Sequence, residues 1–219
     1  MRKKIKFNFQ AVIFDMDGVI TNTMPYHFDA WLETFRQAGV RINCYDIYKR
    51  EGQDGLTSVK EIAKEYKIRL KPDEAKRLLA QKEERFKRIV KIKFVKGSRP
   101  FVRHLKKQGF LLALVTGTSR HEMHRIMPQG LLDMFDVIIT GNDVTKGKPD
   151  PEPFVKVLQR LGVNASEAVV LENAPFGIEA AKKARLSCIA LQTSLPKKYL
   201  FQADAIFKSY AQLRRAIDF

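Results

Sequence analysis

The chain has 219 residues, 45% of them hydrophobic, which is enough for one well-buried domain with a modest insert and excludes a disordered protein. Its net charge of +16 would attract phosphorylated small molecules, nucleic acid or anionic membranes, but the basic residues are spread along the whole chain, so we expect no nucleic-acid partner. Cys44 and Cys188 match no metal-binding spacing, no segment has the ~18 apolar residues of a membrane helix, and the start MRKKIKFNFQ lacks a signal peptide's apolar core, so we expect a cytoplasmic protein without membrane association.

The first predicted strand, residues 11–15, is apolar until it ends in Asp15, and Asp17 follows two residues later. Two carboxylates this close raise each other's pKa unless a cation lies between them. The pair therefore indicates a bound metal, a shared proton or a solvated turn, and the strand alone does not decide between these.

The next segment, residues 24–93, contains helical patterns and no predicted strand. Apolar residues recur at helical spacing in YHFDAWLETFRQAG, SVKEIAKEYKI and PDEAKRLLAQKEERFKRIVK. Gly52 and Gly55 mark a loop between the first two of these helices. We predict that residues 24–93 form a helical cap domain, inserted into a core domain made of residues 1–23 and 94–219.

Strands and helices alternate in the rest of the chain. Nearly continuous apolar runs predict strands at 111–116, 136–140, 168–172 and 187–191, and such runs are typical of strands that are covered on both faces. The helical patterns between them stop at Gly109 and Gly162, which are suitable C-terminal caps, and one begins near Pro151. The alternation predicts an α/β fold with a doubly wound parallel sheet and a helical cap.

Polar residues follow four of these strands, at the sheet edge where parallel α/β proteins bind ligands. Beyond Asp15 and Asp17 they are Thr116, Gly117, Thr118, Arg120, Lys148, Glu172 and Asn173. Acidic and amide oxygens suit Mg²⁺, and Lys148 and Thr116 are placed to bind phosphate oxygens. An ionised Asp15 could attack phosphorus, while Asp17 could protonate the leaving oxygen and then deprotonate water.

In order and spacing, these segments resemble the four motifs of the haloacid-dehalogenase superfamily phosphatases. The matching stretches are DMDGV at 15–19, VTGTS at 115–119, GKPDPEPF at 147–154 and LENAPFGIEAA at 171–181. The resemblance implies that Asp15 is the phosphate-accepting nucleophile, Asp17 the acid and base, and Thr116 and Lys148 the phosphate-binding groups. It also implies a Mg²⁺ ion held by Asp15, Asp17, Glu172 and Asn173, with Asp17 contributing its backbone carbonyl.

The cap segment is similar to one subgroup of that family. TNTMPYHFDAW at 21–31 resembles a motif of the β-phosphoglucomutase-like proteins, whose small helical cap closes over the substrate. The histidine that matches His27 assists proton chemistry in that subgroup, and a half-buried polar role is equally consistent with the pattern. Arg120 either binds a second anionic group of the substrate or is a solvated helix residue.

Two departures from the family pattern affect the interpretation. The fourth motif often reads Glu-Asp, whereas here it reads Glu172-Asn173, which removes one negative charge from the metal site. The sugar mutases carry an arginine near the position of Gly55, and Lys49 and Arg50 lie out of register with it. This difference favours a simple phosphatase over a mutase.

The sequence thus predicts a monomeric, Mg²⁺-dependent phosphatase that hydrolyses a small phosphorylated metabolite through an aspartyl-phosphate. Two alternatives stay open: a β-phosphoglucomutase-like phosphosugar mutase, and a basic protein that binds a polyanion without catalysis.

Overall fold

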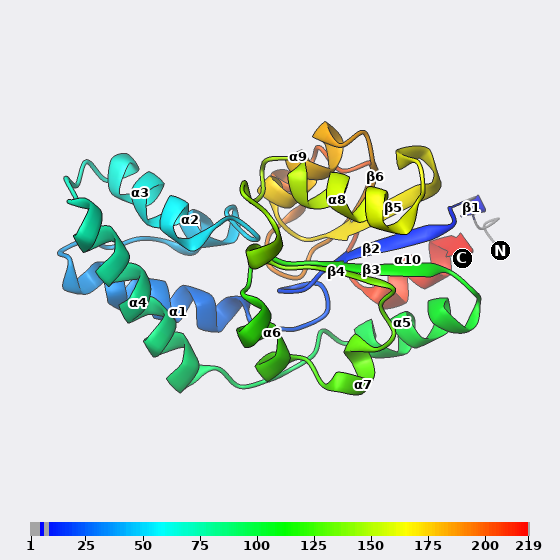
Figure 1. The fold of residues 1–219 in the computed structure, drawn as a ribbon, viewed down its shortest axis with the longest axis horizontal. Coiled ribbons are helices and arrows are strands. Elements are labelled where there is room, and N and C mark those ends of the chain that lie inside the picture. The colour runs from blue at the N-terminus through cyan, green and yellow to red at the C-terminus, as the bar shows by residue number, and fades with distance from the viewer. Residues whose placement is uncertain (1–4, 7–8, 219) are drawn as a thin grey trace.

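The structure, a computed structural model, describes residues 5–6 and 9–218. Within these residues, six parallel strands form one sheet in the order β4-β3-β2-β5-β6-β7 (Figure 1). They are β2 (Ala11–Asp15), β3 (Leu111–Val115), β4 (Val137–Ile139), β5 (Ala168–Glu172), β6 (Ser187–Leu191) and β7 (Ala205–Phe207). Two short parallel strands, β1 (Ile5–Lys6) and β8 (Ile217–Asp218), pair beside this sheet.

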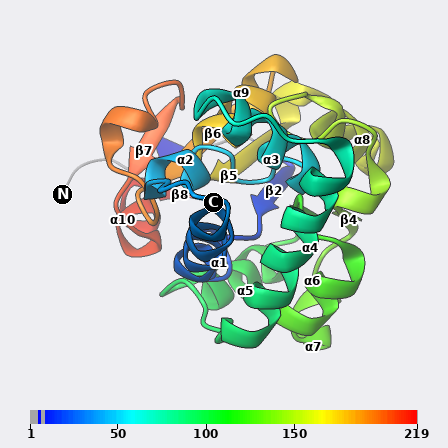
Figure 2. The same ribbon diagram turned by 90° about the vertical axis from the view of Figure 1, so that its left-hand side faces the viewer.

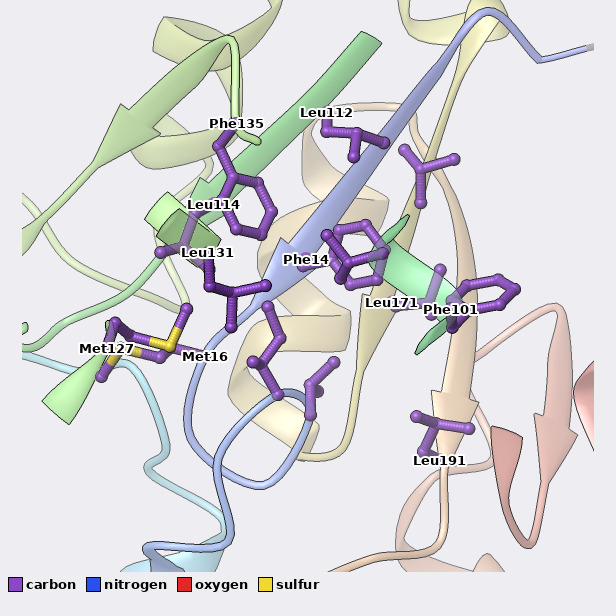
Figure 3. Packing of buried hydrophobic residues seen from close by; sticks show 14 of the residues in the cluster. Phe14, Met16, Phe101, Leu112, Leu114, Met127, Leu131, Phe135, Leu171 and Leu191 are labelled. Carbon is purple, nitrogen blue, oxygen red and sulfur yellow. The ribbon is translucent and has the colours of Figure 1, made fainter. Parts of the chain in front are cut away.

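Helices cover both faces of the sheet, and the core is divided accordingly. Val12 and Phe14 of β2 pack with helices α5 (Ser98–Lys107), α6 (Arg120–Ile126), α7 (Gln129–Leu132) and α10 (Tyr210–Ala216). Ala11 and Ile13 of the same strand face helices α8 (Glu152–Leu161) and α9 (Pro175–Lys183). Figure 3 shows Phe14 among the first set, where its ring meets Phe101 edge-on at 6.2 Å between centroids. Because both faces are buried, the strands read as continuous apolar runs.

The predicted α/β fold with a doubly wound parallel sheet is confirmed. From the central strand β2 the chain first builds β3 and β4 on one side, and it then crosses to build β5, β6 and β7 on the other. The order therefore reverses beside β2, and ligands bind beyond the carboxyl ends of the strands at such a point. The 3₁₀ turns η1 (Gly141–Asp143), η2 (Ala165–Glu167) and η3 (Lys197–Tyr199) lie in the connections.

Residues 24–89 form a helical unit that stands away from the sheet at the left of Figure 1 and faces the viewer in Figure 2. Its helices are α1 (Met24–Gln37), α2 (Cys44–Tyr48), α3 (Gly55–Glu65) and α4 (Pro72–Ile89), and they share a separate apolar cluster around Trp31 and Phe35. The sequence predicted three of these helices. It missed α2, a five-residue helix that the reciprocal hydrogen bonds of Asn43 and Asp46 begin. Gly55, predicted as loop, is the first residue of α3.

Two linkers join this helical unit to the sheet, and they run side by side. The backbone N–H of Asn22 donates to the carbonyl of Lys93 at 2.8 Å, and Val95 donates to Ile20 at 2.9 Å. The chain therefore leaves and re-enters the sheet region at one place. The exact cap boundaries, 24 and 93, stay a prediction, and the predicted core segments also include residues 1–4, 7–8 and 219, which lie outside the described part. None of the described helices is long and apolar enough to cross a membrane.

Candidate active site

A buried lysine joins two buried carboxylates at the carboxyl edge of the sheet. Lys148 Nζ donates to Asp15 Oδ1 at 2.6 Å and to Glu172 Oε1 at 2.7 Å. All three side chains are at most 1% exposed. Asp15 ends β2, Glu172 ends the adjacent β5, and Lys148 comes from the connection after β4, so the sheet topology brings the three segments together.

Burial and the neighbouring charges act on the pKa values of Asp15 and Lys148, partly in opposite directions. Burial raises the pKa of Asp15 well above its usual value, and Glu172 and Asp17 raise it further, while Lys148 works in the opposite direction. Burial also disfavours the charged form of Lys148, but the two carboxylates outweigh this and raise its pKa. The lysine therefore stays charged, and a further cation beside Asp15 would favour the ionised form of that carboxyl group.

The oxygens of the predicted metal ligands fit a hard cation. Among the described residues, Asp15 Oδ2 and Asn173 Oδ1 are buried and meet no hydrogen-bond donor. A buried oxygen without a partner is costly, and Mg²⁺ is bound by oxygens of this kind. Asn173 is oriented by its own Nδ2, which donates to Ser194 Oγ at 2.9 Å.

Glu172 is placed differently from Asp15 and Asn173. Its Oε1 accepts from Lys148, and its Oε2 accepts from the backbone N–H groups of Asn173 and Ala174 at 2.8 and 3.2 Å. Both oxygens are thus engaged by the protein. In the described part of the chain, no three His, Cys, Asp or Glu side chains form a metal site by themselves, so a metal here would rely on amide and backbone oxygens as well.

Asp17 lies beside this group and is surrounded by side chains that can donate hydrogen bonds. Thr23 and Thr21 donate to its Oδ1, Thr118 donates to Oδ2 at 3.1 Å, and His27 Nε2 lies 3.6 Å from Oδ1. Burial opposes the charge of Asp17, but His27 and the hydroxyl donors outweigh it and lower the pKa. Asp17 is therefore ionised in this state.

The ring of His27 stacks on Phe86 at 4.0 Å between centroids. Burial lowers the pKa of His27, and the neighbouring Lys82 lowers it further, so the imidazole is mainly neutral at pH 7. At 3.6 Å from Asp17 Oδ1, the neutral imidazole has no proton to give to ionised Asp17, but it is placed to accept one whenever Asp17 is protonated.

The loop after β3 supplies the predicted phosphate-binding groups. Thr116, Gly117 and Thr118 line a cavity of about 290 Å³ together with Lys148. The structure does not bring Arg120 into this cavity, because its guanidinium donates to Asp143 at 2.7 Å and is half exposed. A substrate contact from Arg120 would require this ion pair to break.

The loop between α2 and α3 closes the cavity from the cap side. Gly52 lies so close to Lys148 that a β-carbon on Gly52 would stand 2.4 Å from Lys148 Cδ. The N–H of Phe176, at the start of α9, donates to the carbonyl of Lys49 at 3.2 Å. Tyr45 of α2 also stacks on Tyr199, with ring centroids 4.3 Å apart. The cap is therefore in contact with the core around the cavity.

Substituting Gly52 by alanine tests whether this close approach matters. The backbone of Gly52 has φ +75°, and the added methyl group would also press on Lys148, so we expect kcat/KM to fall about 10- to 100-fold. Gly39→Ala is the matched control, because Gly39 lies in the same helical unit with φ +78° but has nothing within 4 Å of the added atom. Steady-state kinetics of both variants measure the difference, and equal effects would contradict a role for the approach.

Several charged cavity residues were not identified from the sequence, namely Glu51, Asp54, Lys82, Glu83 and Glu122. Lys82 of α4 reaches the cavity with its ammonium 5.3 Å from the ring centre of Trp31 and 5.2 Å from that of Phe86. Glu51 lines the cavity from the loop beside Gly52. Both lie in segments rich in charged residues, and the sequence does not distinguish them from charged residues on the surface. Only the packing of the cap on the core shows that they line the cavity.

A parallel α/β core with an Asp-Lys-Glu group at its carboxyl edge and a helical cap over the cavity defines a capped hydrolase. The model of the haloacid dehalogenase-like hydrolases matches residues 12–191, and the chain belongs to this family.

Its relatives include phosphatases. The chain is 35% identical to the phosphorylated carbohydrates phosphatase of Thermotoga maritima, covering 90% of this chain and 92% of that protein. It is 28% identical to the validoxylamine A 7'-phosphate phosphatase of Streptomyces hygroscopicus subsp. limoneus, covering 94% and 96%. A provisionally named beta-phosphoglucomutase from Bacteroides vulgatus superposes with a TM-score of 0.84 at 28% identity, covering 96% and 88%. The predicted enzyme class, a phosphomonoester hydrolase of this family, is confirmed.

Proposed function

We propose that this protein is a Mg²⁺-dependent phosphatase that hydrolyses a small sugar phosphate through an aspartyl-phosphate on Asp15. The observation that carries the proposal is the buried contact of Lys148 with both Asp15 and Glu172, at a cavity that Thr116 also lines. The phosphatase relatives and the size of the cavity support a small phosphorylated metabolite as the partner. We further propose a cytoplasmic monomer with no nucleic-acid partner.

In this proposal Asp15 attacks phosphorus, and the bond from phosphorus to the leaving oxygen breaks. Lys148, the Thr116 hydroxyl and the loop at 116–118 hold the phosphate oxygens. Asp17 gives a proton to the leaving oxygen and later takes one from the water that breaks the bond between phosphorus and Asp15. Asp17 is ionised in the free enzyme, so it must gain that proton as the anionic phosphate binds beside it and raises its pKa.

The residues that would hold Mg²⁺ are Asp15 and Asn173 through side-chain oxygens and Asp17 through its backbone carbonyl. When bound, the ion would supply positive charge that favours ionised Asp15 and offsets the charge of the phosphate. We propose that Glu172 serves this site by holding Lys148 and the backbone of Asn173, since both of its oxygens are engaged there. His27 is proposed to exchange protons with Asp17.

The direct test is release of phosphate from p-nitrophenyl phosphate and from a panel of sugar phosphates. We expect turnover with Mg²⁺, loss of turnover in excess EDTA, and recovery when Mg²⁺ is restored. Absence of phosphate release from every compound in the presence of Mg²⁺ would reject the proposed function.

A mutase is the second candidate, favoured by the cap that covers the cavity. Against it, Arg50 is engaged within the cap, where its guanidinium donates to Glu65 at 2.5 Å and to the carbonyl of Asp46 at 2.7 Å. Gly55 offers no side chain to a second phosphate. With β-glucose 1-phosphate as substrate, we expect free phosphate, whereas formation of glucose 6-phosphate would establish the mutase.

Replacing Asn173 by aspartate tests the proposed metal site. The substitution restores a negative charge beside the unpartnered oxygens, and we expect half-saturation at a roughly 10-fold lower Mg²⁺ concentration. Calorimetric titration and the Mg²⁺ dependence of phosphate release both measure this change. Asn164→Asp, at an exposed position just before η2, is the control and is expected to leave Mg²⁺ affinity unchanged. Equal affinities for Asn173→Asp and the wild type would argue against ligation by Asn173.

A further inference from the structure

Glu51 occupies a distinctive place in the loop that covers the cavity. The residues on either side of it have other contacts. Arg50 donates hydrogen bonds to residues of the cap, and Gly52 packs against Lys148. Glu51 itself is half-buried and lines the cavity. Among the described residues, its carboxylate has no hydrogen-bond donor and no cation within ion-pair distance. An unpaired carboxylate is notable in a chain whose net charge is +16.

The surroundings of Glu51 are mainly acidic on the core side. Burial raises its pKa well above the usual value, and the charges of Asp17 and Asp15 raise it further, against the weaker opposite effect of Lys148. On the cap side, Lys82 lies over aromatic rings, and burial lowers its pKa. Besides Asp54 and Glu83, which line it as well, the cap wall of the cavity thus presents the carboxyl group of Glu51 and the ammonium of Lys82.

These two groups face the part of the substrate that is not transferred. The reacting phosphate belongs between Asp15, Lys148 and Thr116, so the leaving group extends toward the cap. A hydroxyl group there can donate to Glu51 and accept from Lys82, which satisfies both groups. Whenever Glu51 is ionised, it would repel a second phosphate at the same place, because like charges in a partly buried cavity repel strongly.

Building on the proposed phosphatase function, we propose that Glu51 determines specificity by admitting hydroxylated monophosphates, such as sugar or polyol phosphates, and rejecting bisphosphates. The residue acts on the choice of substrate through its charge and takes no part in bond making or breaking. Repulsion of a second phosphate by Glu51 would also agree with hydrolysis rather than mutase chemistry, which has to hold a sugar bisphosphate.

The test compares kcat/KM for a sugar monophosphate with that for the bisphosphate of the same sugar, using the glucose, fructose and ribulose pairs. We expect the wild type to prefer the monophosphate, and Glu51→Gln, which removes charge at constant shape, to reduce this preference roughly 10- to 100-fold. Glu51→Lys should reduce it further. Glu84→Gln, which removes the same charge from the outer face of α4 at 59% exposure, is the control and should keep the wild-type preference.

The outcomes separate this inference from the proposed function. A preference that is unchanged in Glu51→Gln and in Glu51→Lys, with thermal unfolding showing both variants folded, would overturn the role of Glu51 while leaving the phosphatase intact. Hydrolysis of p-nitrophenyl phosphate without hydrolysis of any sugar monophosphate would also overturn it. Failure of the wild type to hydrolyse any phosphate ester would instead reject the proposed function itself.

Discussion

Replacing Asp15 by asparagine is expected to lower kcat for phosphate release by at least about 10³-fold. The amide oxygen of asparagine is a poor nucleophile, so the covalent step that we assign to Asp15 would be lost. Asparagine nearly matches aspartate in shape, and the contact of its oxygen with Lys148 can persist, so the variant is expected to fold. Steady-state release of phosphate from p-nitrophenyl phosphate measures the effect.

Asp133→Asn is the matched control for this substitution, because Asp133 is an exposed aspartate at the end of α7. It should keep wild-type turnover. Acid quenching during turnover, followed by mass spectrometry, should find a phosphoryl group on Asp15 in the wild type and none in Asp15→Asn. Turnover at the wild-type rate in Asp15→Asn would exclude Asp15 as the nucleophile.

Replacing Lys148 by methionine is expected to damage both stability and catalysis. The substitution leaves Asp15 and Glu172 buried without their shared cation, and breaking a buried pair in this way costs about 3–5 kcal/mol. It also removes a proposed phosphate ligand, so we expect kcat/KM to fall at least about 10²-fold. Urea unfolding in EDTA measures the free energy of unfolding, and kinetics with Mg²⁺ measure the catalytic loss.

The loss of stability should depend on pH in a defined direction. Without the lysine, the pKa of Asp15 is raised even further above its unfolded value, so the variant is favoured at low pH and loses stability as the pH rises through the folded pKa. The deficit relative to the wild type should therefore shrink as the pH is lowered. Lys146→Met, an exposed lysine of the same loop, is the control. Unfolding of Lys148→Met at the wild-type free energy would show that the buried contacts contribute little.

The sheet and the reacting group were predictable because both follow from strong rules. A strand buried on both faces must be apolar throughout, which made β2, β3, β5 and β6, and also the shorter β4, recognisable. Parallel strands present their carboxyl ends at one edge, so residues as distant as Asp15, Lys148 and Glu172 were expected to meet there. β7 was missed because its three residues are only half-buried, and Asp204 and Lys208 flank it, so no continuous apolar run marks it.

The environment of individual side chains was less predictable, since it depends on competing partners. Arg120 follows the phosphate loop in sequence, yet Asp143 in the turn after β4 binds its guanidinium. The role of Glu172 as a metal ligand stays a prediction, and the sequence did not indicate that Lys148 and the backbone N–H groups of Asn173 and Ala174 donate to its oxygens. The positions of Glu51 and Lys82 depend on how the cap sits on the core, and no local pattern encodes that.

The cap is joined to the core by two linkers on one side and by non-covalent contacts over the cavity on the other. This difference determines the side on which substrate is expected to enter. The linkers at 20–22 and 93–95 are tied to each other by backbone hydrogen bonds, so they form a stiff double hinge that persists when the cap moves. The contacts over the cavity include the ring stack of Tyr45 on Tyr199, the hydrogen bond from Phe176 to the carbonyl of Lys49, and the close approach of Gly52 to Lys148. These contacts are non-covalent and can break while the linkers stay joined. We therefore expect the cap to rotate about the linkers as one rigid body. The cap and the core would then separate beside Tyr199 when substrate enters and again when product leaves.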